Sequence, residues 1–360
     1  MSELRLALGL MSGTSCDGID AALVETDGRC RVRCGKATTF PYDATFQARL
    51  RSVMGGRGDI PAVERELTEL HAKEVGNLLT SAGIPARDVT VVGFHGQTIL
   101  HEPERGRTWQ IGDGALLARL TGIDVVNDFR SRDVAAGGQG APLVPAFHAA
   151  LAANLERPIA VLNIGGVANV TWVGDQTEDG DLLAFDTGPG NALLNDWALR
   201  HLGVPVDRDG VLARAGRVDQ AVLSLLMADP YFSRPAPKSL DRDAFDASPV
   251  AALTPADGAA TLAAFTAAAV ARATDLFPAP PKRWLVTGGG RHNPAIMQGL
   301  TAALAAPIAP VESVGWDGDA LEAQAFAYLA VRSLDGLPLS LPTTTGVRQP
   351  TTGGRLHRRP

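Results

Sequence analysis

Cysteine is scarce in this chain of 360 residues, which holds only Cys16, Cys30 and Cys34. An odd and sparse set makes a poor disulfide framework, so the sequence favours a reducing compartment, the cytoplasm. Cys30 and Cys34 have no second pair of ligands, which argues against a structural zinc site. Long apolar runs are missing too, so we expect no membrane span. Glu3 and Arg5 interrupt the start of the chain, so we expect no signal peptide either.

Acidic residues outnumber basic residues only slightly, which gives a net charge of -6. This balance does not favour a nucleic-acid partner. The basic residues near the end of the chain are expected to form a solvated terminus, and these are Arg355, His357, Arg358 and Arg359. The chain also lacks a G-x-x-x-x-G-K-[ST] phosphate loop and a G-x-S-x-G nucleophile elbow. What remains is ordinary, with 45% hydrophobic and 20% charged residues in a chain long enough for two domains.

Residues 6–24 are predicted to form a strand, a tight turn and a second strand. The turn is made of small polar residues and glycines, namely Ser12, Gly13, Thr14, Ser15 and Gly18. Such residues let backbone N–H groups approach an anion closely, and Asp17 and Asp20 suit a hydrated cation. The turn is therefore a candidate phosphate-binding site. Small polar residues are equally common in ordinary turns, so this stretch alone leaves both interpretations open.

A similar pattern recurs over residues 159–173, where two apolar arms flank Gly165 and Gly166. Two hairpins of this kind, one near the start of each half, indicate a duplicated architecture. The boundary between the halves is expected near residues 156–158. Further helices are expected over residues 61–82, 143–155, 257–277 and 320–334, further strands over 30–40, 283–287 and 307–314, and an irregular tail after Gly336.

Polar side chains follow two buried strands of the first half. His95 and Gln97 come after a strand over residues 89–94, and Arg130 comes after a strand over 124–129. Ligands of open α/β sheets bind at the carboxyl ends of the strands. These three residues are therefore candidates for substrate binding.

In the second half, a strand over residues 182–185 leads to Asp186 and then to Gly188-Pro189-Gly190 and a helix. A carboxylate at the end of a buried strand is well placed to act as a general base, while the helix N-terminus accommodates negative charge. Asp186 could instead simply cap that helix, and the local sequence alone favours capping.

Three consecutive glycines, Gly288 to Gly290, follow the expected strand over residues 283–287. Bare backbone of this kind suits a flat or anionic ligand. Asp317-Gly318-Asp319 opens the last expected helix and puts Glu322 in its first turn, where an acidic residue also suits the helix dipole.

Together these motifs resemble the superfamily of sugar kinases, heat-shock chaperones and actin. More specifically, five stretches are similar, in the same order, to the motifs of anhydro-N-acetylmuramic acid kinases, and they are residues 11–20, 95–98, 163–169, 185–191 and 287–293. The resemblance runs from Leu8 to about Leu329. It implies an α/β fold of two ribonuclease-H-like domains, residues 1–156 and 157–360, with a nucleotide cleft between them. The last helix is expected to pack back on the first domain.

The resemblance also implies the reaction. ATP, with Mg²⁺, would phosphorylate O6 of 1,6-anhydro-N-acetylmuramic acid while water opens the anhydro ring. The product would be N-acetylmuramic acid 6-phosphate, an intermediate of peptidoglycan recycling. The implied protein is a cytoplasmic homodimer that acts on a small sugar, with no nucleic-acid or membrane partner.

Residue roles follow from the same resemblance. Asp186 matches the catalytic base, and His95, Gln97, Arg130 and Glu322 are assigned to the sugar. ATP is assigned to Gly13, Thr14, Ser15, Cys16, Asp17, Gly18, Ile19, Asp20, Asn163, Gly165, Gly166, Asn169, Gly288, Gly289, Gly290 and Asn293. No direct metal ligand is expected, because Mg²⁺ would be reached through ATP and water, with Asp17 a candidate contact.

The lactyl carboxylate of the sugar calls for a cation, and the fork of Arg130 matches a carboxylate well. Pairing of Arg130 or Arg132 with Asp128 or Asp133 is an equal alternative. Two other functions also stay open at this stage. One is another sugar or acid kinase of the same fold, whose product gains phosphate but no water. The other is an actin-like or chaperone-type ATPase with a protein partner.

Overall fold

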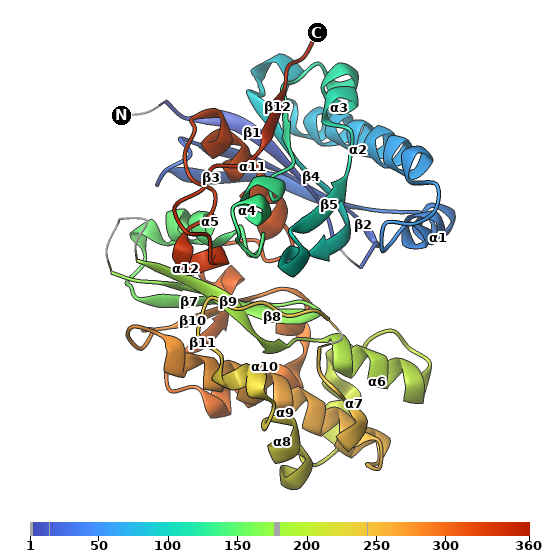
Figure 1. Ribbon diagram of the computed structural model, residues 1–360, viewed down its shortest axis with the longest axis vertical. Coiled ribbons are helices and arrows are strands. Elements are labelled where there is room, and N and C mark those ends of the chain that lie inside the picture. The colour runs from blue at the N-terminus through green and yellow to red at the C-terminus, as the bar shows by residue number, and fades with distance from the viewer. Residues whose placement is uncertain (1–2, 14, 176–180, 243) are drawn as a thin grey trace. The chain divides into compact units, whose positions relative to one another are not determined.

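The structure, a computed structural model, describes residues 3–13, 15–175, 181–242 and 244–360. The chain forms two compact units (Figure 1). Unit 1 comprises Met1–Asn154 and Asp319–Pro360, and unit 2 comprises Leu155–Gly318. The chain thus enters unit 2 just before the expected boundary at residues 156–158. The chain returns to unit 1 at Asp319, and the whole segment from there to Pro360 belongs to that unit. From the sequence, only the last helix was expected to pack on the first domain.

Unit 1 is built on a sheet with the strand order β12-β6-β4-β1-β2-β3, and β5 pairs with β4. β2 lies antiparallel to both β1 and β3, whereas β4 lies parallel to β1 and β6. The strands are β1 (Arg5–Ser12), β2 (Gly18–Thr26), β3 (Val32–Pro41), β4 (Val91–Glu102), β5 (Arg107–Ile111), β6 (Val125–Asn127) and β12 (Arg355–His357).

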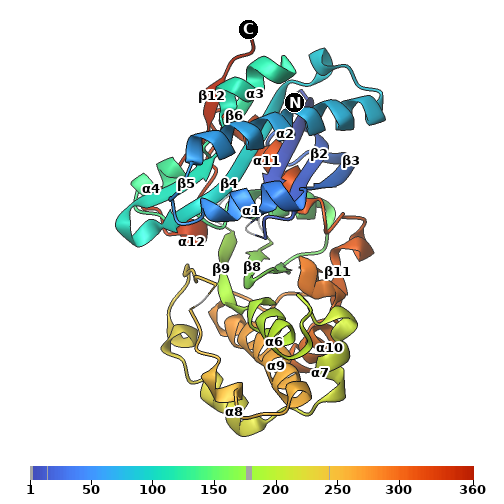
Figure 2. The same cartoon turned by 90° about the vertical axis from the view of Figure 1, so that its right-hand side faces the viewer.

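Helices cover both faces of this sheet (Figure 2). α2 packs on β2 and β3, and its apolar side chains join Leu8 and Leu10 of β1 in one buried core. α11 packs on β1, β2 and β4. The helices of unit 1 are α1 (Ala44–Ser52), α2 (Ile60–Ala82), α3 (Gly114–Thr121), α4 (Ser131–Ala135), α5 (Pro145–Leu151), α11 (Leu321–Leu334) and α12 (Pro342–Thr345).

The backbone of α11 lies directly on the sheet because two glycines leave room for it. A Cβ atom added at Gly9 would lie 1.8 Å from the carbonyl oxygen of Ala323, and one at Gly93 would lie 2.0 Å from that of Phe326. Neither position can carry a side chain without moving the helix. Successive residues of a strand face opposite sides, so Leu8 and Leu10 point to the α2 core while Gly9 meets α11.

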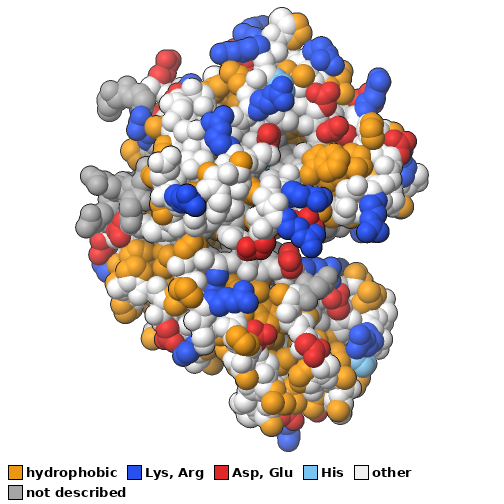
Figure 3. All heavy atoms as spheres, viewed as in Figure 1, with side chains coloured by type: hydrophobic (Ala, Val, Ile, Leu, Met, Phe, Trp, Pro, Cys, Tyr) orange, Lys and Arg blue, Asp and Glu red, His pale blue; other side chains and the backbone are white. Residues whose placement is uncertain are grey.

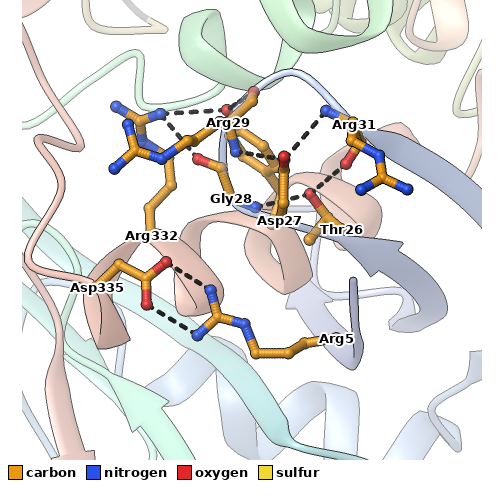
Figure 4. Close-up of polar contacts among 9 residues, drawn as sticks. Arg5, Thr26, Asp27, Gly28, Arg29, Arg31, Arg332 and Asp335 are labelled. Carbon is orange, nitrogen blue, oxygen red and sulfur yellow. Dashed lines mark hydrogen bonds and ion pairs between the residues drawn. The ribbon is translucent and has the colours of Figure 1, made fainter. Parts of the chain in front are cut away.

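The other end of α11 is anchored by polar contacts at the end of the sheet where β1 begins and β2 turns into β3 (Figure 4). Arg332 donates from Nη1 to the carbonyl oxygen of Gly28 over 3.0 Å, in the turn between β2 and β3. Just after the helix, Asp335 accepts two hydrogen bonds from the guanidinium of Arg5, at the start of β1. The helix that carries Glu322 is therefore held to the sheet along its length.

Unit 2 is built on a sheet with the order β11-β10-β7-β8-β9. α9 packs on β9 and is flanked by α6, α7, α8 and α10, with Phe185, Phe265 and Trp284 in the core. The strands are β7 (Ile159–Ile164), β8 (Val167–Val173), β9 (Leu182–Pro189), β10 (Trp284–Thr287) and β11 (Ile308–Pro310). The helices are α6 (Ala192–Leu202), α7 (Val211–Ala215), α8 (Gln220–Leu226), α9 (Pro255–Ala273) and α10 (Pro294–Ala303).

The two sheets have the same topology. In unit 1, β1, β2 and β3 form an antiparallel meander, and β4 and β6 follow in parallel on the other side of β1. In unit 2, β7, β8 and β9 form the meander, and β10 and β11 follow in parallel on the other side of β7. This is the ribonuclease-H-like arrangement, present twice. The predicted duplication and the predicted fold class are confirmed.

The prediction for the C-terminal tail was wrong. The segment after Gly336 forms α12 and β12, and β12 pairs antiparallel with β6. Arg358 is exposed, as expected, and it also donates to the Asp124 carboxylate over 2.6 Å. A three-residue strand has no detectable periodicity, so only its partner strand reveals it. The sequence also missed α1, α3, α8 and β5, and the helix expected over residues 143–155 already ends at Leu151.

No helix among the described residues combines the length and the apolar character needed to cross a membrane. On the face that Figure 3 displays, Lys and Arg side chains are interspersed with Asp and Glu. This distribution accords with the small net charge of -6.

Candidate functional site

A buried hydrogen-bond network supports the turn between β1 and β2. Ser12 Oγ donates to Gln97 Oε1 over 2.7 Å and lies 2.9 Å from the hydroxyl of Tyr42. Gln97 Nε2 donates to the carbonyl oxygen of Gly13 over 3.1 Å. Gln97 has no exposed surface, although the sequence assigned it to the sugar. In this structure its amide fixes the start of the turn.

Only part of this turn is available to a ligand. Ser15 and Asp17 are exposed, and Ser15 Oγ donates to Asp17 Oδ1 over 2.8 Å. Cys16 and Ile19 are buried, with 1% and 2% of their surface exposed, so only their backbone could meet a nucleotide. Thr14, also assigned to ATP, lies outside the described residues.

The residues at positions 95–98 lie within a strand rather than after one, which corrects the expectation from the sequence. β4 continues to Glu102 because its second half pairs with β5. The register with β1 shifts where β1 ends, since Leu10 pairs with Phe94 but Ser12 pairs with Gln97. Such a bulge redirects side chains and is common beside active sites. His95 lies at this bulge.

Four elements of unit 1 bring charged and polar groups together. Arg130 precedes α4 and donates from Nε to His95 Nε2 over 3.1 Å, and from Nη1 to the carbonyl oxygen of Gly140 over 2.7 Å. Glu322, in the first turn of α11, acts electrostatically on Arg130, and Asp20 of β2 acts on Glu322. The structure thus brings together three residues that the sequence assigned separately, namely His95, Arg130 and Glu322.

Burial dominates the titration of this cluster. It lowers the pKa of Arg130 to about 10, against the opposing effect of Glu322 and Asp133. It also lowers the pKa of His95 well below its ordinary value, and the charge of Arg130 adds to that shift. The pKa of Glu322 is raised by burial, while Arg130 opposes the shift. At neutral pH, Arg130 is therefore a buried cation beside a neutral histidine.

In unit 2, Asp186 lies inside β9, which runs on to Pro189, and not at the strand end that the sequence suggested. Its register with β8 is irregular, because Asn169 pairs with Asp186 whereas Ala168 pairs with Gly188. Thr187 is the extra residue of this bulge. The bulge explains how a carboxylate inside a strand is redirected.

Asp186 does not cap the following helix, although the local sequence favoured that role. The N-cap of α6 is Asn191, and Asp186 Oδ2 instead accepts a hydrogen bond from the backbone N–H of Leu240 over 2.7 Å. Burial raises the pKa of Asp186 to about 7. The Leu240 N–H opposes this shift and the charge of Asp241 adds to it. A carboxyl group with a pKa near 7 suits a general base.

The second hairpin turn joins β7 to β8 through Gly165 and Gly166. Their carbonyl oxygens accept hydrogen bonds from the backbone of Asn191 and Gly190, which ties this turn to the end of β9. Asn163 and Asn169 pair across the two strands. The turn assigned to phosphate therefore lies one strand away from Asp186.

The triple glycine leads into a 3-10 turn over Gly289–His292, and α10 then begins at Pro294. Gly288 has a positive φ of 75°, and a Cβ there would lie 2.3 Å from Asn163 Oδ1. The amide of Asn293 caps α10, since Oδ1 accepts from the N–H of Ala295 over 3.0 Å. Its Nδ2 donates to the carbonyl oxygen of Asp207 over 3.4 Å, so both polar atoms of this side chain are engaged within unit 2.

The glycines assigned to ATP fall into two groups. At several of them a Cβ would collide with the backbone or with side chains closer than 3 Å, and these are Gly18, Gly288 and Gly290. At others a Cβ would meet nothing closer than 3.5 Å, and these are Gly13, Gly165, Gly166 and Gly289. The fold requires the first group. It leaves room for a side chain at the second group, where glycine is not needed for packing.

Sequence reasoning missed several residues that contact the site. Tyr42 supports Ser12 at the first turn, and Tyr231, Lys238 and Leu240 contact Asp186. None of them belongs to a motif, because each reaches its partner through the tertiary fold. Only the strand and turn residues carried a local signal.

The duplicated ribonuclease-H-like topology, together with glycine turns at the first hairpin of each unit, defines the class of sugar kinases and their relatives. The family described as anhydro-N-acetylmuramic acid kinase matches residues 5–358. A curated relative of that name from Paramagnetospirillum magneticum is 61% identical over 355 residues, covering 98% of this chain and 99% of its own. Another from Rhodospirillum rubrum is 60% identical over 354 residues, covering 97% and 93%. The chain belongs to the anhydro-N-acetylmuramic acid kinase family.

Among solved structures, component A of the (R)-2-hydroxyglutaryl-CoA dehydratase of Acidaminococcus fermentans aligns with a TM-score of 0.46 and 15% identity, covering 91% of this chain and 99% of its own.

Proposed function

We propose that this chain transfers the γ-phosphoryl group of ATP to O6 of 1,6-anhydro-N-acetylmuramic acid while water opens the anhydro ring. Water forms a bond to the anomeric carbon, and the bond from that carbon to O6 breaks. O6 forms a bond to the γ-phosphorus, and ADP leaves. The product is N-acetylmuramic acid 6-phosphate. Family membership and the sugar named in the relatives support this reaction.

Asp186 is the base in this proposal, and its environment is the observation that carries it. The water loses a proton as it attacks, and Asp186 accepts that proton. A pKa raised to about 7 by burial lets the carboxyl group be ionised at neutral pH and still accept a proton readily. The bulge at Thr187 supports the role as well, since it redirects this part of β9.

The glycines that the fold does not require support the assignment of the turns to the ATP phosphates. A side chain at Gly13 would have room, because a Cβ would meet only Ser15 Oγ at 3.5 Å. Gly165 and Gly166 in the second hairpin are equally uncrowded. Glycine at such positions serves the close approach of a ligand to backbone N–H groups.

Mg²⁺ fits these residues as an ion held mainly by phosphate and water. Within the described ranges, no group of three or more His, Cys, Asp or Glu side chains forms a metal cage. The Asp17 carboxylate is exposed in the first turn, and one or two carboxylates suffice for a magnesium ion that keeps several waters. When bound, the ion neutralises charge that develops on the transferred phosphoryl group.

For the sugar, we assign Arg130 to the lactyl carboxylate and Glu322 to a hydroxyl or amide donor. The bonds from Arg130 to His95 and to the Gly140 carbonyl fix its guanidinium plane. Buried His95 supports Arg130 rather than the sugar itself, and buried Gln97 supports the first turn. The sequence had assigned both His95 and Gln97 to the sugar, so these proposed roles revise that assignment.

The experiment is a measurement of product mass with purified enzyme, ATP, Mg²⁺ and the anhydro sugar. The proposal predicts a product heavier than the sugar by one phosphoryl group and one water. A product that gains the phosphoryl group alone would make the chain a plain hydroxyl kinase. ATP turnover that does not depend on the sugar would indicate an ATPase of another role.

We also propose that the protein is a cytoplasmic homodimer. Three apolar side chains in and just after the second half of α6 are exposed. Their exposed fractions are 55% for Leu199, 53% for Leu202 and 41% for Val204. Exposed apolar groups close together in the chain favour a protein interface. The three cysteines are thiols, which suits a reducing compartment. Light scattering of the wild type and of Leu202→Glu tests the dimer, which the charge should dissociate.

A further inference from the structure

One segment of unit 2, residues 229–241, surrounds Asp186 with hydrogen bonds. The backbone N–H of Asp186 donates to the carbonyl oxygen of Lys238 over 2.9 Å. Its own carbonyl oxygen accepts from the Tyr231 hydroxyl over 2.5 Å. Its carboxylate Oδ2 accepts from the Leu240 N–H over 2.7 Å. Both sides of the Asp186 backbone and one carboxylate oxygen are therefore fixed by the same segment.

The segment is itself rigidly packed. Tyr231 is 3% exposed, and its ring meets those of Phe232 and Phe245 edge to face, with centroids 5.9 Å apart in each pair. Buried Lys238 donates from Nζ to the carbonyl oxygen of Tyr231 over 3.0 Å. The same ammonium lies 4.4 Å from the centroid of the Tyr231 ring, an attractive cation–π contact. Lys238 therefore holds Tyr231 through both its backbone and its ring.

The contacts distinguish the two oxygens of the carboxylate. Among the described residues, hydrogen bonds of the structure reach Oδ2 of Asp186 but not Oδ1. An oxygen that already accepts an N–H bond is the weaker base of the pair, and the other keeps its lone pairs for a new proton. Burial also raises the pKa of Tyr231, so its hydroxyl stays protonated and remains a donor.

We propose that Tyr231 and Lys238 are positioning residues that hold Asp186 with Oδ1 as the atom that takes the proton from water. This inference rests on the proposed role of Asp186 as base. The proton leaves the attacking water as its oxygen bonds to the anomeric carbon, and it ends on Oδ1. Neither Tyr231 nor Lys238 exchanges a proton in this step. They act through the orientation of Asp186, where a displacement of about 1 Å can cost roughly 100-fold in rate.

The test compares Tyr231→Phe, Asp186→Asn and the double variant in kcat and KM. Tyr231→Phe removes one hydroxyl and keeps the ring that packs against Lys238. We expect its kcat to fall roughly 10- to 100-fold, with the KM values for ATP and sugar within about twofold of wild type. The kcat of Asp186→Asn should fall by about 10²–10⁴-fold. The double variant should be no slower than Asp186→Asn, because the hydroxyl acts only through that carboxylate.

Tyr328→Phe in unit 1 is the matched control. Tyr328 is 1% exposed, and its hydroxyl also donates to a backbone carbonyl, that of Arg29, over 2.7 Å. The Tyr328 hydroxyl also accepts from Arg332 Nη1 over 3.2 Å, so Tyr328→Phe should lose at least as much thermal stability as Tyr231→Phe, but it should keep the wild-type kcat. If Tyr231→Phe does not yield folded protein, Lys238→Met carries the same test, and Lys238→Arg should recover part of the loss.

The outcomes separate the two claims. A wild-type kcat in Tyr231→Phe, beside an inactive Asp186→Asn, would overturn the positioning role and leave the base in place. A further loss in the double variant would overturn it as well, since the hydroxyl would then act independently of Asp186. Near-normal turnover of Asp186→Asn would overturn the proposed base and the positioning role together.

Discussion

The guanidinium Nε of Arg130 donates a hydrogen bond to Nε2 of His95 over 3.1 Å. Nδ1 of His95 lies 2.8 Å from the carbonyl oxygen of Gly96 and must be the donor there, which leaves Nε2 as the acceptor. His95 is therefore neutral, and burial and the charge of Arg130 keep its pKa well below the ordinary value. A neutral histidine can orient Arg130 without competing for an anionic ligand.

Arg130→Ala should raise the KM for the anhydro-muramic substrate. It should affect an analogue without the lactyl group much less, because the lactyl carboxylate is the partner proposed for Arg130. A hydrogen bond between charged groups contributes about 1.5–3 kcal/mol, so the two substrates should separate by roughly tenfold or more. Steady-state kinetics with both sugars measures this difference.

Arg132→Ala is the matched control for that experiment, because Arg132 lies two residues further and donates to the Thr352 hydroxyl at the surface. It should leave both KM values near wild type. Equal losses on the two sugars in Arg130→Ala would show that Arg130 only stiffens its loop, and the carboxylate partner would then lie elsewhere.

The rate should depend on pH through Asp186. A base must be ionised, and the pKa of Asp186 is raised to about 7 by burial, so kcat should rise with pH through about 7. The charge of Asp241 contributes to that shift. Asp241→Asn should therefore move the midpoint of the kcat profile to lower pH. Asp246→Asn, a neighbouring exposed carboxyl, should leave it in place, and an unmoved midpoint in Asp241→Asn would contradict this account of the shift.

Gly13→Val should weaken nucleotide affinity without destabilising the protein. A Cβ at Gly13 has room in the fold, so a loss of binding would come from the blocked approach of phosphate to the backbone. Calorimetric titration with a non-hydrolysable ATP analogue measures the affinity. Gly76→Val, at a position with nothing within 4 Å of an added Cβ, serves as the control. Unchanged nucleotide binding in folded Gly13→Val would reduce this hairpin to a structural turn.

Gly9→Ala should destabilise unit 1 strongly. An added Cβ would lie 1.8 Å from the carbonyl oxygen of Ala323, so α11 must move away from the sheet. Overpacking of this kind typically costs about 1–3 kcal/mol and occasionally more. Thermal denaturation should show a lower Tm than for Gly76→Ala, where the new methyl group has free space. An unchanged Tm would mean that α11 can shift freely on the sheet.

The sequence predicted most of the strands, the longest helices and the duplication, because each has a periodicity or a glycine turn that is visible locally. The helix expected over residues 61–82 is α2, Ile60–Ala82, and both hairpins are present. The sequence singled out Asp186 as the proposed base, but it did not predict the place of this residue inside β9, because a bulge depends on the register with β8. Tyr231 and Leu240 carried no signal, since they meet Asp186 only through the tertiary fold.

The most direct test of the proposed reaction follows the oxygen of water. The enzyme is incubated with ATP, Mg²⁺ and 1,6-anhydro-N-acetylmuramic acid in ¹⁸O-water, quenched early, and its products are fragmented in a mass spectrometer. The account predicts ¹⁸O on the anomeric carbon of the sugar phosphate and none in the phosphoryl group. Label in the phosphoryl group, or a sugar phosphate that keeps its anhydro ring, would contradict it.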